Sequence, residues 1–283
     1  MIDLKELIKA GVYFGHQKSR WCPKMLPYIW GHRSGIHLID VSKTALNLEK
    51  SAEFLKSIAE QGKPILWVGT KHAAQKAVND IAVSLEMPYI THRWVGGLIT
   101  NFSQVKKSVT KFLHFEDVLN KSEEFNYTKK ELSKLQKSAE KLKRIVGGIK
   151  NLTWPIGAIV VVDAKKEETA IKEATQSGVP IVAIVDTNSD PSLINYVIPA
   201  NDDSPKSIEI ILNYLAKTIA QGKEKIKQTK LEEEEKEALE TKEGISGIQE
   251  LEQEVETQET GTGWKKPKKV RSVAKKIIKK DSE

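Results

Sequence analysis

The sequence contains a single cysteine, Cys22, and no apolar run that approaches 18 residues. One cysteine excludes an intramolecular disulfide framework and favours a reducing compartment. The lack of a long apolar run argues against a membrane span, and the first residues do not resemble a secretory signal. Hydrophobic residues make up 39% of the 283 residues and aromatic residues 6%. We expect a soluble, cytosolic protein with one large domain and additional polar segments.

Signatures of common enzyme classes are also missing. No Gly-x-Gly-x-x-Gly follows an expected strand, no P-loop sequence is present, and no Gly-x-Ser-x-Gly elbow occurs. An enzyme of sugar-phosphate isomerase type would need a phosphate loop, for which only residues 69–71 are a candidate. Acids stand at the expected strand ends, where short acids more often form caps and turns than catalytic sites: Asp163, Asp186, Asp190, Asp202 and Asp203. The sequence therefore predicts that the protein is not an enzyme.

Charge is distributed unevenly along the chain, whose formal net charge is +7. Residues 103–150 carry 12 basic against 6 acidic side chains, whereas residues 151–222 carry 5 against 9. Residues 223–260 are acidic, and residues 261–283 are basic. Basic charge points to a polyanionic partner for the first half. The acidic second half of the domain suits a protein partner better than RNA.

Apolar runs of strand length alternate with helical patterns through most of the chain. Expected strands cover residues 36–40, 64–69, 87–90, 158–163, 180–186 and 196–199, and expected helices cover 3–10, 40–62, 71–85, 166–176 and 204–221. This alternation predicts an α/β fold with a parallel sheet. We expect the sheet to bury Leu66, Val68, Ile159, Val161, Ile181 and Ile184.

Residues 103–148 interrupt the alternation. Apolar positions at spacings of three and four run along two segments, and Thr128 with Glu131 has the form of a capping box between them. This pattern predicts an antiparallel coiled-coil hairpin. Five cations lie about 200° round the second helix from its apolar seam; we call them the cationic ribbon (Lys130, Lys134, Lys137, Lys141 and Arg144). A ribbon of one sign favours RNA, although charge runs are also common on solvated faces.

Two further segments combine basic and ring side chains. Residues 12–30 have no helical period, contain two prolines, and either contact RNA or form a small aromatic core. Residues 92–102 (HRWVGGLITNF) form a loop in which Gly96 and Gly97 permit a sharp turn. Arg93 is suited to phosphate, and Trp94 either stacks or fills the core.

Three side chains from distant segments could bind a divalent ion. His16, Asp186 and Asp202 supply the nitrogen and oxygen ligands that zinc accepts. Their spacing matches no metal-binding motif. A zinc or magnesium site is therefore a hypothesis, and no cofactor is required.

The segment 92–102 resembles a signature of the bacterial-type small-subunit ribosomal protein two family. Seven further segments resemble the family in the same order: residues 12–17 (VYFGHQ), 21–25 (WCPKM), 68–71 (VGTK), 147–150 (GGIK), 171–174 (IKEA), 184–191 (IVDTNSDP) and 197–203 (VIPANDD). The resemblance covers residues 4 to 222. It implies a flavodoxin-like α/β domain with an inserted coiled-coil hairpin, and a structural role in the small ribosomal subunit without catalysis.

The resemblance also implies partners and a location. We expect binding to small-subunit ribosomal RNA, contacts with neighbouring ribosomal proteins, and help in docking ribosomal protein one, which captures messenger RNA. Neither a membrane nor a small-molecule substrate is expected. The location is the ribosome of the bacterial cytoplasm, with a plastid as the alternative. A coiled-coil adaptor is a further alternative, but it would need apolar residues where the ribbon stands.

The predicted RNA-binding set combines these observations: Lys18, Arg20, Lys24, Arg33, Lys71, His92, Arg93, Trp94, Lys106, Lys107, Lys111, Lys130, Lys134, Lys137, Lys141 and Arg144. The predicted domains are 1–102 with 149–222 (α/β), 103–148 (hairpin) and 223–283 (charged, disordered tail). The family pattern offers no counterpart for the tail. Its basic segments 264–269 and 275–280 either contact RNA or a membrane surface or remain solvated.

Overall fold

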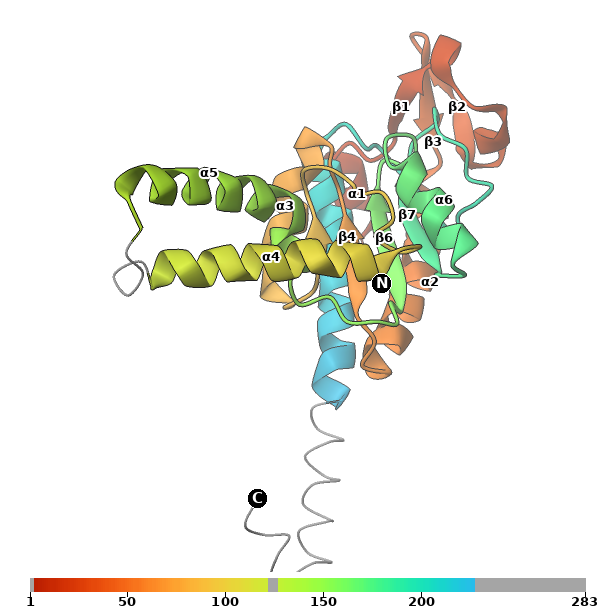
Figure 1. Ribbon diagram of the computed structural model, residues 1–283. Helices are drawn as coiled ribbons and strands as arrows, with labels where there is room; N and C mark the ends of the chain where they lie inside the picture. Colours follow the sequence, from red (N-terminus) through yellow and green to blue (C-terminus); the bar gives the residue numbers. More distant parts are fainter. Residues whose placement is uncertain (1–2, 122–126, 227–283) are drawn as a thin grey trace, which may run out of the picture. The chain divides into compact units, whose positions relative to one another are not determined.

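A five-stranded parallel sheet organises the computed structural model, which describes residues 3–121 and 127–226 (Figure 1). The strand order is β5-β4-β6-β7-β8. The chain therefore places β5 on one side of β4 and then adds β6, β7 and β8 in turn on the other side. This order is that of a flavodoxin-like fold, as the resemblance implied. The strands are β4 (Ile65–Val68), β5 (Tyr89–Ile90), β6 (Ala158–Val162), β7 (Ile181–Val185) and β8 (Tyr196–Pro199).

Alternate strand residues enter two separate cores, which explains the continuous apolar runs. Ile65 and Trp67 face one core, and Leu66 and Val68 face the other. All six strand residues predicted to be buried are 0% exposed. The first core is covered by α1 (Leu4–Lys9), α2 (Val41–Glu60), α3 (His72–Ser84) and the helix over 205–226, and the second by α6 (Glu168–Gln176) and the base of the hairpin.

The N-terminal region forms a second, antiparallel sheet that the sequence analysis did not predict. Its order is β1-β3-β2, with β1 (Phe14–Gln17), β2 (Ile29–Arg33) and β3 (Ile36–Ile39). The expected irregular loop over 12–30 instead contains two strands and the 3-10 turns η1 (Lys18–Arg20) and η2 (Pro23–Tyr28). Ser34 and Gly35 both have positive φ, the geometry of a tight hairpin turn, and this turn joins β3 to β2. The strand expected at 36–40 exists but lies outside the parallel sheet.

The predicted hairpin is present as α4 (Phe102–Asn120) and α5 (Lys129–Val146), which lie side by side (Figure 1). Its seam buries Val105, Val109 and Phe112 on α4, and Ala139 and Val146 on α5. Thr128 and Glu131 form the predicted capping box at the start of α5. Four of these seam residues and Ile149 join the second core, so the base of the hairpin is packed against the sheet; Ala139 is not part of that core.

The closing helix begins at residue 205 and continues to at least residue 226, beyond the end predicted at 221. Asp3 and Asp40 cap α1 and α2 through their carboxylates. Among the described residues, no helix is both long and apolar enough to cross a bilayer. The predictions for the tail segments 264–269 and 275–280 lie outside the described residues.

Candidate functional site

The cationic ribbon lies on the solvent face of α5. All five of its side chains are exposed, while Leu132, Leu135 and Leu142 turn towards α4 and are half-buried. Within the described part of the chain, none of the five cations forms an ion pair with a carboxylate. Their charge is therefore available to an external anion. The outer face holds cations where an adaptor helix would need apolar side chains, so the adaptor hypothesis gains no support.

The other predicted RNA-binding cations occupy several surfaces. Lys106, Lys107 and Lys111 are exposed on α4, where the Lys111 ammonium lies 5.6 Å from the centre of the Phe115 ring. His92 and Arg93 are exposed in the loop before α4, and Lys18, Arg20 and Arg33 are exposed around the small sheet. Lys24 is exposed but bonds Asp190 at 2.7 Å. The structure therefore gathers only the hairpin cations on one element pair.

Two members of the predicted RNA-binding set have contacts that oppose that role. Trp94 is only 9% exposed and packs in the second core, so its ring offers no face to a base. The Lys71 ammonium lies 3.3 Å from Asp163, 2.7 Å from Asp202 and 2.5 Å from Asp203. Three carboxylates around one cation repel phosphate. We therefore remove Trp94 and Lys71 from the set, and residues 69–71 do not form a phosphate loop.

Glu173 on α6 fixes the loop over 92–101, a role that the sequence analysis missed. Its Oε1 accepts hydrogen bonds from the indole Nε1–H of Trp94 at 3.0 Å and from the backbone N–H of Gly97 at 2.9 Å. Its Oε2 accepts from the N–H of Ile99 at 3.3 Å. The loop that precedes α4 is thus bonded to α6. Because this loop leads directly into α4, the same bonds hold the base of the hairpin in place.

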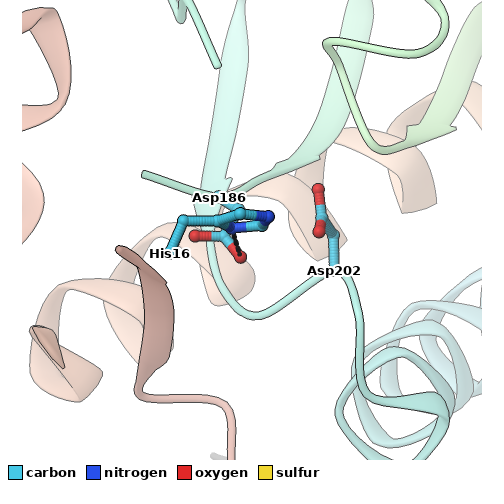
Figure 2. Close-up of side chains that lie close together, drawn as sticks. All are labelled: His16, Asp186 and Asp202. Atoms are coloured by element: carbon cyan, nitrogen blue, oxygen red, sulfur yellow. Dashed lines mark ion pairs between the residues drawn. The ribbon is translucent and has the colours of Figure 1, made fainter. Parts of the chain in front are cut away.

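The three candidate metal ligands meet at the carboxyl edge of the parallel sheet (Figure 2). Each contributes one ligand atom, and these atoms lie within 4.8 Å of one another. His16 comes from β1, Asp186 follows β7 and Asp202 follows β8, so the cluster bridges the two sheets. His16 Nδ1 lies 2.9 Å from Asp186 Oδ2, and its Nε2 lies 3.1 Å from the Asn188 amide nitrogen and 3.4 Å from Asp203 Oδ2. Because metal–ligand bonds measure about 2.0–2.2 Å, the cluster would contract around an ion.

Burial raises the electrostatic cost of placing negatively charged carboxylates in this cluster. Asp202 is 0% exposed, and its Oδ2 has no hydrogen-bond partner among the described residues. Its burial, together with the charges of Asp163 and Asp186, raises the pKa of Asp202 to about 7 despite the bond to Lys71. The hydrogen bond to Asp186 raises the pKa of His16. A cation at this point would offset the clustered negative charge.

Thr187 positions His16 across 171 residues of sequence. Its Oγ1 accepts a hydrogen bond from the His16 backbone N–H at 2.9 Å. Gly15 permits this approach, because a Cβ there would lie 2.7 Å from the Thr187 methyl carbon. The segment 186–192 also contacts the connection between β1 and β2 through Cys22, whose N–H donates to the Thr187 carbonyl at 2.7 Å.

A cavity of about 600 Å³ opens where η2, α2 and the segment 191–197 meet. Lys24 and Lys50 line it together with Tyr28 and Tyr196. Three large apolar side chains on the neighbouring segments are exposed: Leu26 (62%), Trp30 (75%) and Leu193 (47%). We call the cavity and these three side chains the apolar patch. None of the three lines the cavity itself, but exposed apolar groups on adjoining segments are typical of a protein-binding surface.

Comparisons with known proteins agree with the resemblance seen in the sequence. A family model described as ribosomal protein S2 matches residues 7–222. The small ribosomal subunit protein uS2 of Dictyoglomus thermophilum is 43% identical over 223 residues, which cover 79% of this chain and 91% of that protein. The protein of the same name from Phocaeicola vulgatus is 43% identical over 226 residues, which cover 80% of this chain and 81% of that protein.

Proposed function

The chain belongs to the ribosomal protein S2 family and is a structural protein of the small ribosomal subunit, not an enzyme; we propose that it binds small-subunit ribosomal RNA through its helical hairpin and helps dock ribosomal protein one. The named relatives are bacterial, which supports the proposal of a bacterial cytoplasmic location.

The observation that carries the RNA proposal is the cationic ribbon. Five exposed cations follow one face of α5, and the opposite face packs against α4. A rigid row of this kind matches a phosphate backbone, whose negative charges also recur along a line. The exposed Lys106 and Lys107 near the start of α4 extend the basic surface towards the root of the hairpin.

The apolar patch supports the docking proposal. Trp30 is 75% exposed, and aromatic side chains that pack against a partner contribute strongly to binding. Lys50 in the cavity favours a partner segment that carries a carboxylate beside its apolar side chains, whereas Lys24 is already paired with Asp190. In this proposal, ribosomal protein one binds the apolar patch with a segment of its own that carries acidic and apolar side chains.

Sedimentation of cell lysate through sucrose at moderate salt tests both proposals together. We expect the chain in the small-subunit and whole-ribosome fractions. Replacing Trp30 by Ala should leave the chain in those fractions but lower the content of ribosomal protein one by roughly tenfold, because loss of a buried aromatic anchor costs about 1.4 kcal/mol or more.

Val83 provides the control for Trp30, because it is a 58% exposed apolar residue on α3, away from the patch. Val83→Ala should change neither distribution. If the chain stays at the top of the gradient, the ribosomal role fails. If ribosomal protein one is retained in full by Trp30→Ala, the patch is not its docking site.

We also propose that His16, Asp186 and Asp202 hold one divalent cation. The buried Asp202 Oδ2 without a described partner is the observation that favours it, since a buried carboxylate oxygen needs a donor or an ion. One imidazole with two carboxylates suits zinc better than magnesium, which prefers oxygen ligands and retained water. The ion would join β1 to the parallel sheet.

Metal addition should raise the thermal midpoint of the metal-free chain. At a free ion concentration 100 times the dissociation constant, binding contributes about 2.7 kcal/mol, which corresponds to a shift of about 5–10 °C for a domain of this size. We expect zinc to act more strongly than magnesium, with one ion bound per chain in equilibrium dialysis.

Two variants separate the cluster from general metal effects. His16→Gln should abolish the shift, whereas His114→Gln, at an exposed histidine on α4, should keep it. Absence of any zinc- or magnesium-dependent shift in the unchanged chain would remove the metal from the proposal and leave the ribosomal role intact.

A further inference from the structure

Trp154 lies in the segment that connects the hairpin to β6, and 49% of its surface is exposed. Large aromatic side chains are mostly buried on average. Trp154 is exposed although a residue on each side of it in the sequence is buried. Leu152 is 7% exposed and Ile156 is 6% exposed, and both pack in the second core. The segment is therefore anchored on either side of an indole that remains open to solvent.

One face of the indole is braced from behind. The Phe102 ring, at the first position of α4, stacks on it with ring centres 6.2 Å apart and planes inclined by 26°. Phe102 itself is half-buried and packs against the second core. A ring held in this way loses little conformational freedom when a second flat group covers its open side.

Two exposed cations stand on the segments that carry the two stacked rings. Lys106 lies one turn beyond Phe102 on α4, and positions i and i+4 share a helix face. Lys150 lies four residues before Trp154, and both lysines are exposed. The first turn of α4 carries no acid. An exposed ring on segments that also carry exposed cations suits a nucleotide, with the base on the ring and the phosphate at an ammonium group.

We propose that Trp154 is a stacking platform for one unpaired base of small-subunit ribosomal RNA. The inference rests on the proposed RNA binding and adds a contact that the cationic ribbon does not provide. The ribbon binds phosphates in any sequence context, whereas Trp154 takes a base that has left its helix. The platform lies at the root of the hairpin, beside the start of α4.

The full chain and protein-free small-subunit ribosomal RNA provide the test. Trp154→Ala should weaken binding by about 5- to 100-fold, the range given by alanine substitution of base-stacking aromatics. The slope of log affinity against log salt should not change, because an indole neutralises no phosphate. Trp154→Phe should restore most of the affinity. Val83→Ala, at an exposed apolar residue on α3, should have no effect on RNA affinity.

A direct readout comes from ultraviolet crosslinking of small subunits that contain the unchanged chain. We expect RNA attached to the tryptic peptide 151–165, which contains Trp154 as its only tryptophan. Crosslinking of that peptide to another protein instead, or equal affinities for Trp154→Ala and the unchanged chain, would overturn the platform. If ribbon variants still lose affinity in that case, the proposed RNA binding stands. If the unchanged chain does not bind the RNA, both proposals fail.

Discussion

Replacing the five ribbon cations by Gln should flatten the salt dependence of RNA binding. Each phosphate contact contributes roughly 0.7–0.9 to the slope of log affinity against log salt, so the loss of five contacts should lower the slope by about 3.5–4.5. With six to ten contacts, the unchanged chain should lose about 10³–10⁵ in affinity between 50 and 200 mM salt. Replacement of the same five residues by Glu should abolish binding and release the chain from small subunits in a sucrose gradient.

The α/β domain offers a matched control with the same change of charge. Five of its lysines are exposed and lie outside the hairpin: Lys63, Lys76, Lys172, Lys206 and Lys217. Their replacement by Gln should lower the slope by much less than the ribbon variant does. Both variants should keep their helix content, because the ribbon faces away from the seam. Equal slopes for the two variants would mean that the ribbon is only a solvated face.

Replacing Glu173 by Ala should destabilise the domain by about 2–4 kcal/mol, because three donors lose a charged acceptor. Two of them, the Trp94 indole N–H and the Gly97 N–H, bond the same oxygen at 3.0 and 2.9 Å. Glu173→Gln should cost less, since its amide oxygen can still accept from some of these donors. Urea unfolding should show a lower midpoint with an unchanged slope, and the thermal midpoint should fall by about 5–15 °C.

Glu168 on the same helix is the control for Glu173. Its carboxylate is 67% exposed and pairs with Lys172 one turn away. Exposed pairs of this kind contribute about 0.2–1 kcal/mol, so Glu168→Ala should unfold almost as the unchanged chain does. Similar midpoints for the two alanine variants would show that Glu173 does not anchor the loop.

Sequence periodicity was sufficient to predict the helices and strands that are determined by the spacing of neighbouring apolar residues. The hairpin follows from apolar residues at spacings of three and four, and its structure has the predicted seam, capping box and exposed ribbon. The six strand positions predicted to be buried are fully buried for the same reason, since a strand covered on both faces must be apolar throughout. Leu46 shows the limit of this argument, because it continues the apolar pattern of α2 but is 52% exposed.

The tertiary structure alone decided what each aromatic ring and each strand-end charge contacts. Trp94 and Trp154 stand in irregular segments and Trp30 stands in β2; Trp94 fills the core, whereas Trp30 and Trp154 remain exposed. Lys71 stands beside a short strand like a phosphate ligand, but three carboxylates from loops after β6 and β8 enclose it.

The sequence by itself determined the α/β class, the hairpin and its cationic face, because these depend on residues three, four or two positions apart. It also contained the separate members of the His16, Asp186 and Asp202 cluster. Only the tertiary structure placed β1 to β3 in their own antiparallel sheet and brought His16 to the end of β7. Such contacts join residues about 170 positions apart, and no local spacing encodes which strand edge a distant segment will meet.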